Sequence, residues 1–428
     1  MPNTFGATPQ IDKFLDWRYG LFVHWNPSSV IGHEISWSRE NDKPEQPHKP
    51  RAHTVSPRTC IPAELYDSLY RYFDASHWDA RDFVAKAKAW GFRYIYLTTK
   101  HHDGFCNFDT DLTDYKVTSS SCPAGRDLTR EYVDACRELD MGLGIYYSQP
   151  DWHHPDYRTE NHDRYIQYLH AQIEELCTRY GKIDVWWFDG LTANEKGDNH
   201  VTGLATPAAY HEEPNPGLWD AEALLKKMRA WQPDMVINDR CVLQADFYTP
   251  EQRVGGFDPE NPWESSMTIG GQWAYSFDEV VKSSDEMIGH VVDAACGGGN
   301  FVLNVGPDRH GLIPPEQERV LNQIAAWMDA YGHTIYGTRG GPYPRWRWGG
   351  ATHDGNTIYV HVRRWPELQD RLTLPLGGAR PQSVTLLTGE GLTYEVEGDL
   401  IHLDLGLQND NALDNIVEMK LDKLPVLQ

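Results

Sequence analysis

The sequence predicts a (β/α) barrel of the TIM type that is followed by an antiparallel β-sandwich. From about residue 18 to residue 340, short apolar segments alternate with segments of helical period, which is typical of a parallel sheet covered by helices. Polar side chains follow several of the apolar segments, as they do at the carboxyl ends of barrel strands. After Gly341 the helical period disappears, and short alternating segments separated by turns remain. We therefore expect a barrel domain over residues 1–340 and a β-sandwich domain over residues 341–428.

The expected barrel elements follow one another in order along the first part of the chain. The helical period is clearest in residues 164–181, where Leu169, Ile173 and Leu176 recur on one face. An open doubly wound sheet would also alternate strand and helix, but polar residues at the ends of several strands favour the barrel. The expected strands cover residues 19–25, 94–99, 142–148, 183–189, 235–240 and 297–307, and the expected helices cover residues 77–91, 127–140, 164–181, 220–232 and 278–295.

Long segments follow several of the expected strands, at residues 38–70, 152–161, 191–218 and 241–264. In a barrel these loops would all lie at the face where the strands end, so they would crowd that face and wall a pocket. The region after residue 341 has no catalytic constellation of its own. We expect it to cap the barrel, with sugar binding as the alternative role.

The net charge of the chain is −23, from 39 Lys and Arg against 62 Asp and Glu. This charge argues against a nucleic-acid backbone or an anionic membrane surface as the partner and fits a neutral ligand. Aromatic residues make up 12% of the chain, including 16 Trp. Aromatic faces suit the C–H faces of sugars, although core packing explains many of them equally well.

The cellular context is also indicated by composition. The seven Cys form no CxxC pair and are odd in number, which favours reduced thiols over a disulfide framework. The chain has no segment of about 20 apolar residues, the length that a membrane helix needs. The first 17 residues have no apolar core flanked by positive charge, so we expect no secretory signal and a cytoplasmic location.

The residues at the strand ends are of the types that glycoside cleavage uses. A carboxylate such as Asp189, directly after the apolar run Val185–Phe188, is costly to bury unless it has a partner or a role. Two carboxylates with aromatic and neutral hydrogen-bonding groups can cleave a glycosidic bond, because one attacks or activates water and the other protonates the leaving oxygen. A carboxylate also stabilises the positive charge of the transition state. The candidate side chains are His24, His101, His102, Tyr147, Trp152, Trp187, Asp189, Asn238, Asp239, Arg240, Glu251, Glu264 and Trp273.

A metal centre or a cofactor is the weaker interpretation of these residues. His101 and His102 are adjacent with Asp103 next to them, but neighbouring strand residues point to opposite faces and cannot easily share one ion. The chain has no HExxH motif. The glycines at residues 297–299 precede a strand instead of linking a strand to a helix, so they predict a turn and not a phosphate loop. We expect neither a metal nor a cofactor.

These residues lie in motifs that resemble the α-L-fucosidases of glycoside hydrolase family 29. The resemblance covers most of residues 18–340, and "TKHHDGF", "WFDG" and "VLNVGP" in this order are its most specific part. The β-rich C-terminal region fits the same family. The resemblance implies a retaining exo-enzyme that removes terminal α-L-fucose from oligosaccharides or glycoconjugates. The other motifs that carry it are "GLFVHW", "GIYYSQPDW", "INDR", "DFYTPE" and "PWESSMTIGGQWAY".

The resemblance also implies roles for individual residues. The nucleophile of the family is the Asp that ends its "W-x-D-G"-like strand, which corresponds to Asp189. Trp187 and Trp273 would form the apolar wall that meets the methyl group of fucose. Many members have adjacent Glu and Trp in the loop after the first strand, whereas this chain has "HEISWS", which favours Trp37 as the sugar contact and leaves the role of Glu34 open. The residues expected to bind the fucose hydroxyls are His24, Trp37, His101, His102, Tyr147 and Arg240.

The acid/base residue has two candidates. Glu251 in "DFYTPE" follows Arg240 closely, at the type of site where many members carry this residue. Glu264 in "PWESS" is the rival, and its other interpretation is a structural carboxylate. The segment 191–218 and the "TPE" context resemble the branch that prefers α-1,3/1,4-linked fucose. A barrel glycosidase with another sugar specificity and a sugar-binding protein without catalysis are the alternatives, although a lectin would need neither Asp189 nor Glu251.

Overall fold

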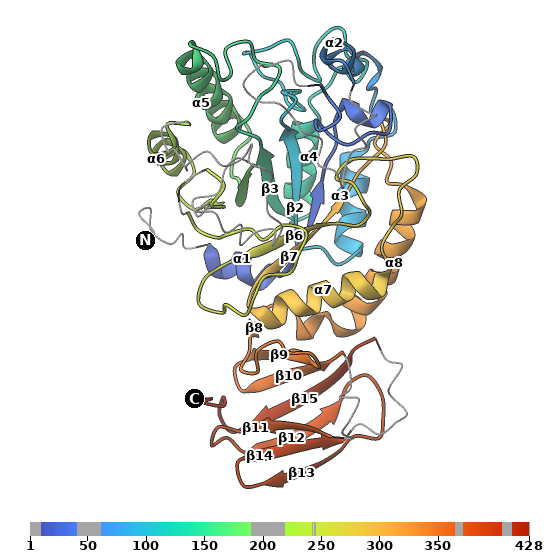
Figure 1. Ribbon diagram of the computed structural model, residues 1–428, viewed down its shortest axis with the longest axis vertical. Coiled ribbons are helices and arrows are strands. Elements are labelled where there is room, and N and C mark those ends of the chain that lie inside the picture. The colour runs from blue at the N-terminus through green and yellow to red at the C-terminus, as the bar shows by residue number, and fades with distance from the viewer. Residues whose placement is uncertain are drawn as a thin grey trace.

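The computed structural model describes residues 10–40, 61–189, 219–241, 243, 245–363, 371–404 and 413–427. A parallel sheet surrounded by helices forms one end of the molecule and an all-β part forms the other, as Figure 1 shows. The predicted insertion 191–218 lies outside the described residues, as does much of the insertion 38–70. The boundary after residue 340 stays a prediction, and strand β8 (Arg339–Gly340) already pairs with β9 (Gly349–Asp354) of the C-terminal part.

The parallel sheet has seven strands in the order β5-β4-β3-β2-β1-β7-β6. Isolated parallel bridges join Asn238 to Phe247, Tyr248 to Trp263 and Glu251 to Ser266, so residues 247–251 connect the two edge strands. This continuity around the ring is consistent with a (β/α) barrel and not with an open sheet. The strands are β1 (Tyr19–Val23), β2 (Tyr94–Lys100), β3 (Gly142–Tyr147), β4 (Val185–Phe188), β5 (Val236–Ile237), β6 (Glu264–Thr268) and β7 (Asn300–Val305).

The helices α3 (Ala80–Ala89), α4 (Leu128–Glu138) and α7 (Ser284–Gly297) begin at polar side-chain caps. The side chain of Asp79 accepts a hydrogen bond from the backbone of Asp82 at the start of α3, which satisfies a free N–H group there. Ser283 caps α7 in the same way, so this helix begins six residues later than the predicted residue 278. The helices α1, α2 and α8 were not predicted. The main helices are α1 (Ile11–Trp17), α2 (Ala63–Asp67), α3 (Ala80–Ala89), α4 (Leu128–Glu138), α5 (His162–Arg179), α6 (Ala221–Trp231), α7 (Ser284–Gly297) and α8 (Pro315–Tyr331), with short 3₁₀ turns at Pro27–Val30, Leu69–Tyr72 and Gly332–Thr334.

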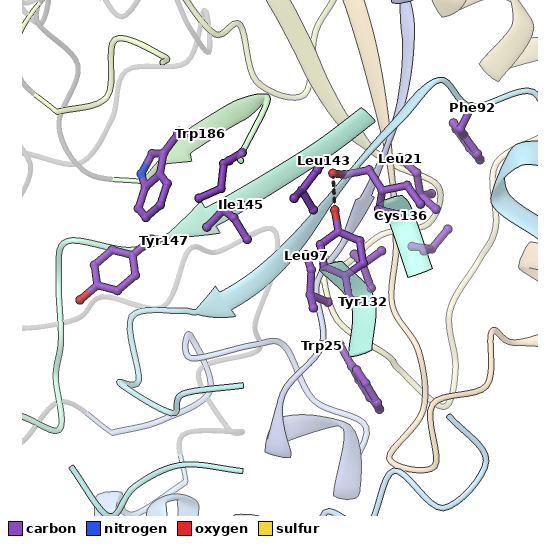
Figure 2. Close-up of a cluster of buried hydrophobic side chains, with 14 of the residues drawn as sticks. Leu21, Trp25, Phe92, Leu97, Tyr132, Cys136, Leu143, Ile145, Tyr147 and Trp186 are labelled. Carbon is purple, nitrogen blue, oxygen red and sulfur yellow. Dashed lines mark hydrogen bonds between the residues drawn. The ribbon is translucent and has the colours of Figure 1, made fainter. Parts of the chain in front are cut away.

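The two faces of the barrel strands build two separate cores, because successive side chains of a strand point to opposite sides. The outer core lies between the sheet and the helices, and Figure 2 shows Leu143, Ile145 and Tyr147 of β3 in it. The inner core fills the barrel and is rich in aromatic rings. Its members among the described residues are Phe14, Phe22, Tyr94, Tyr96, Tyr146, Val185, Trp187, Val236, Phe247 and Val302.

The C-terminal part is an antiparallel β-structure of two sheets with a core of its own. A five-stranded sheet has the order β12-β15-β10-β9-β8, and a three-stranded sheet has the order β11-β14-β13. Apolar residues of both sheets share one buried cluster, and α7 of the barrel contacts β8 and β9. The remaining strands are β10 (Thr357–Val362), β11 (Leu372–Pro375), β12 (Pro381–Leu386), β13 (Thr393–Glu397), β14 (Leu400–Asp404) and β15 (Asn415–Leu421).

The cysteines and the helices can be compared with what the composition predicted. All six cysteines within the described ranges are buried and free, which agrees with reduced thiols. In the same part of the chain, every helix is too short or too polar to cross a lipid bilayer.

Candidate active site

Asp189 follows strand β4 and lies at the end of the barrel where the strands terminate, with 20% of its side chain exposed. It accepts a hydrogen bond of 2.6 Å from the Tyr146 hydroxyl and contacts Arg240 Nη1 at 3.2 Å and His102 Nε2 at 3.4 Å. Burial alone would raise the pKa of Asp189, but the positive fields of His102 and Arg240 and the bond from Tyr146 lower it below its ordinary value. Asp189 is therefore held as a carboxylate.

Arg240 joins the two predicted catalytic carboxylates. Its Nη1 atom lies 3.2 Å from Asp189 Oδ1 and 2.9 Å from Glu251 Oε2. Its Nε atom donates to Thr249 Oγ1 at 2.8 Å, and its guanidinium lies over the Trp187 ring at 4.4 Å from the ring centroid. Residues from β4 and from the segment that follows β5 thus meet at one guanidinium.

His24 directly follows β1, and its imidazole ring is neutral. Its Nδ1 atom lies 2.6 Å from Asn304 Oδ1, and Asn304 Nδ2 donates to the backbone oxygen of Trp273 at 2.7 Å. The second bond orients the amide, so Nδ1 of His24 is the atom that donates and Nε2 is left to accept. Burial lowers the pKa of His24 to about 3, so the ring stays uncharged at neutral pH.

The two adjacent histidines both reach this site. The ring centroids of His101 and His102 are 4.2 Å apart. The two side chains can lie on the same side because β2 ends at Lys100, so the alternation of a strand no longer applies to them. His101 Nδ1 lies 2.6 Å from Ser36 Oγ. His102 Nδ1 lies 2.6 Å from Ser148 Oγ, and this hydroxyl donates to a backbone oxygen, so Nδ1 of His102 donates and its Nε2 faces Asp189.

The model of the α-L-fucosidase family matches residues 4–333 of the chain, and thus most of its length. The chain belongs to the α-L-fucosidase family. Human tissue α-L-fucosidase is 26% identical to it over 372 residues, which are 82% of this chain and 75% of that protein. The family match, this relative and the solved structures of bacterial α-L-fucosidases together show that the chain is a glycoside hydrolase with α-L-fucosidase activity.

Solved structures of bacterial α-L-fucosidases have the same fold. Isoenzyme 1 from Paenibacillus thiaminolyticus is 30% identical with a TM-score of 0.79, over 97% of this chain and 99% of that one. A family 29 α-L-fucosidase from Bacteroides thetaiotaomicron, described as a trapped covalent intermediate in complex with 2-fluoro-fucosyl fluoride, is 27% identical with a TM-score of 0.79, over 98% of this chain and 99% of that one.

The predicted tyrosine contact in this α-L-fucosidase is corrected from Tyr147 to Tyr146. Tyr147 lies in the outer core (Figure 2). Its hydroxyl donates to Gln172 of α5 at 2.7 Å. Tyr146 points into the barrel, stacks on His101 with 5.6 Å between ring centroids and bonds to Asp189. The alternation of "GLGIYY" contained this signal, because Tyr147 shares its side of the strand with Leu143 and Ile145.

Three tryptophans predicted at the sugar site approach the histidines or Arg240. Trp273 lies 4.8 Å from the His24 ring, and Trp37 lies 5.3 Å from the His102 ring, measured between centroids. Trp187 lies beneath Arg240. They supply the apolar surfaces that the C–H faces and the methyl group of a deoxy sugar would need.

Glu34, whose role the sequence left open, holds the loop that carries Trp273. Its carboxyl group accepts hydrogen bonds from the backbone N–H groups of Trp273 at 2.9 Å, Ala274 at 3.1 Å and Ile35 at 2.9 Å. Burial raises the pKa of Glu34 to about 7, although the three backbone bonds lower it. Glu34 acts on the pocket through Trp273, because its oxygens are occupied by the backbone.

The rival acid/base candidate Glu264 is the first residue of β6 and is fully buried in the barrel interior. Its oxygens bond to Trp187, Tyr94 and Tyr96. Glu251, in contrast, has 13% of its side chain exposed and contacts Arg240 directly. The structure therefore brings Glu251 to the same cation as Asp189 and keeps Glu264 behind Trp187.

His101, His102 and Asp189 have the spacing of a metal site, since one ligand atom from each lies within 4.8 Å of the others. Asp189 is already paired with Arg240, and a positive guanidinium beside the carboxylate opposes the binding of a cation there. The same three groups suit the hydroxyls of a sugar, because they offer two imidazole nitrogens and a carboxylate close together.

Proposed function

We propose that the chain is a retaining exo-glycosidase that releases terminal α-L-fucose by a two-step double displacement. The observation that carries this proposal is the Arg240 guanidinium, which contacts Asp189 and Glu251 at once. His102 lies beside Asp189, and Trp187 lies beneath the guanidinium. Two carboxyl groups on the same cation are close enough to act on one glycosidic bond. The trapped covalent intermediate described for the Bacteroides relative supports a covalent route.

In the first step of the proposed mechanism, Asp189 attacks the anomeric carbon while Glu251 protonates the departing oxygen. The low pKa of Asp189 keeps the attacking oxygen ionised. In the second step, Glu251 takes a proton from water, which attacks the anomeric carbon and releases fucose. The carboxylate of Asp189 leaves with the electron pair of the C–O bond, so the enzyme returns to its starting state.

The surrounding groups would bind the hydroxyls of fucose and exclude water. Nε2 of the neutral His24 would accept a hydrogen bond, and Nε2 of His101 offers a second polar contact from a ring whose centroid lies 5.6 Å from that of His24. The preference for α-1,3/1,4 linkages remains part of the proposal and rests on the "TPE" context of Glu251 and the length of the insertion 191–218. Rates on α-1,2-, α-1,3-, α-1,4- and α-1,6-fucosylated glycans would test it.

The mechanism is tested by azide rescue of two variants on an aryl α-L-fucoside. Asp189→Ala and Glu251→Ala should each lower kcat at least about 10³-fold. Azide should attack directly in Asp189→Ala and give a β-fucosyl azide, whereas in Glu251→Ala it should attack the covalent intermediate and give an α-fucosyl azide. NMR of the products distinguishes the two. Full activity of Glu251→Ala would exclude Glu251 as the acid/base, and fucose binding without turnover by the wild-type protein would favour a sugar-binding protein.

A further inference from the structure

Glu264 is a buried carboxyl group whose contacts are all neutral. Its Oε1 atom accepts a hydrogen bond from Trp187 Nε1 at 3.1 Å, and its Oε2 atom lies 2.5 Å from the Tyr94 hydroxyl and 3.3 Å from the Tyr96 hydroxyl. The side chain has no exposed surface. Among the described residues, it makes no ion pair within 4.0 Å. Burial raises the pKa of Glu264 to about 8, which describes a carboxyl group that is neutral at physiological pH.

The barrel interior is shaped to bring the two tyrosines to this carboxyl group. A Cβ atom on Gly20 would lie 2.3 Å from the Tyr94 ring, and a Cβ atom on Gly144 would lie 2.4 Å from the Tyr96 ring. Side chains at either position would displace the rings. The glycines of β1 and β3 therefore make room for the contacts of Glu264, which are part of the packing of the barrel and not an incidental approach.

Trp187 connects this buried group to the catalytic carboxylates. Its indole N–H bonds to Glu264, while its ring lies 4.4 Å from the Arg240 guanidinium and stacks on Tyr146 at 5.8 Å and 20°. Arg240 and Tyr146 are two of the groups that contact Asp189. The orientation of one indole ring thus influences both supports of the proposed nucleophile.

We propose that Glu264 is a positioning residue that anchors the Trp187 indole and thereby holds Arg240 and Tyr146 against the catalytic carboxylates. The proposal rests on the proposed function of Asp189 and Glu251. Glu264 itself does not touch the substrate, because Trp187 and the two tyrosines occupy its oxygens. Its hydrogen bond to the indole prevents the ring from tilting, and a tilt would move the guanidinium that joins Asp189 to Glu251.

A pair of variants separates this role from acid/base catalysis. Glu264→Gln reproduces the neutral carboxyl group, because its amide oxygen still accepts from Trp187 and its NH₂ group replaces the acidic O–H. It should keep kcat/KM within about threefold of the wild type. Glu264→Leu has a similar volume but no acceptor, so it should lower kcat about 10- to 100-fold with a smaller change in KM. Thermal unfolding of each variant checks that the fold is retained.

A double-mutant cycle tests whether the effect passes through the indole. Trp187→Phe keeps an aromatic ring and removes the N–H group, so Glu264→Leu should cost little further activity in that background. If the losses of activity from Trp187→Phe and Glu264→Leu instead multiplied in the double variant, Glu264 would act by another route and the proposal would be overturned. A collapse of Glu264→Gln to the level of Glu251→Gln would instead make Glu264 the acid/base residue. Full activity of Glu264→Leu would overturn the positioning role as well.

These outcomes are distinct from a failure of the proposed function. If Asp189→Ala and Glu251→Ala remained active, the proposed mechanism would be wrong, whatever the Glu264 variants did. If those two variants lost activity and Glu264→Leu did not, only the inference about Glu264 would be wrong. The same aryl fucoside assay reads both results.

Discussion

Strand β4 presents Trp186 and Phe188 to the surrounding helices and Trp187, with Asp189 after it, to the interior of the barrel. The outer side is a packing surface, where Trp186 lies in the apolar core that Figure 2 shows. The inner side carries hydrogen bonds and charges, from Glu264 through Trp187 to Arg240. One strand thus serves stability on one face and chemistry on the other, so adjacent residues should respond differently to substitution.

The largest effect is expected at Arg240. Arg240→Met removes the cation that contacts both carboxylates, so kcat/KM should fall about 100-fold or more. Loss of the positive charge also removes a field that lowers the pKa of Asp189, so the acid limb of the pH profile should move to higher pH. A pH–rate profile of kcat/KM measures both changes.

Arg18 provides the matched control, because it is also a buried arginine. It lies at the opposite end of the barrel and bonds to the backbone oxygens of Thr338, Gly298 and Gly299. Arg18→Met should lower the Tm. In the protein that remains folded, the acid limb of the pH–rate profile should be unchanged. An acid limb that moved equally in both variants would contradict the assigned role of Arg240.

A smaller effect is expected from the neighbouring tyrosines of β3. Tyr146→Phe removes the hydrogen bond to Asp189 and should lower kcat/KM about 10- to 100-fold, since bonds to charged groups contribute about 1.5–3 kcal/mol. Tyr147→Phe removes only the bond to Gln172 and should change the free energy of unfolding by about 1 kcal/mol without changing kcat/KM. Equal kinetic losses in the two variants would contradict the separation of the two faces.

The last effect concerns stability and not activity, and it is a pH-dependent difference in the free energy of unfolding at Glu264. The carboxyl group is protonated in the folded state up to its pKa of about 8, whereas in the unfolded chain it ionises near its ordinary value of 4.5. The folded state therefore binds more protons between these values, and wild-type stability falls as pH rises there, by at most about 1.4 kcal/mol per pH unit. Urea unfolding should show Glu264→Gln gaining stability relative to the wild type from pH 5 to pH 8. The opposite trend would indicate that Glu264 is ionised in the folded protein.

The alternation of strands and helices predicted the parallel sheet correctly, because hydrophobic periodicity is a local property of the chain. The same local reasoning placed His24, His101, His102 and Asp189 at strand ends, and these side chains lie next to one another. The failure at Tyr147 came from transferring a motif with two adjacent tyrosines without following the alternation of the strand. The assignments of Asp189 and Glu251 as catalytic groups stay predictions until the variants are measured.

The sequence by itself determined the family, six of the seven described strands of the parallel sheet and most of the residue types in the site, but it did not predict β6. Only the tertiary structure decided which tyrosine faces inward, that Glu34 holds the backbone of Trp273, and that Glu264 lies behind Trp187. Each of these contacts joins residues from different elements, and Glu34 lies 239 residues from Trp273 in the chain. Such contacts depend on how neighbouring strands are aligned and on which rings fill the barrel, and neither is encoded in the periodicity of a single segment.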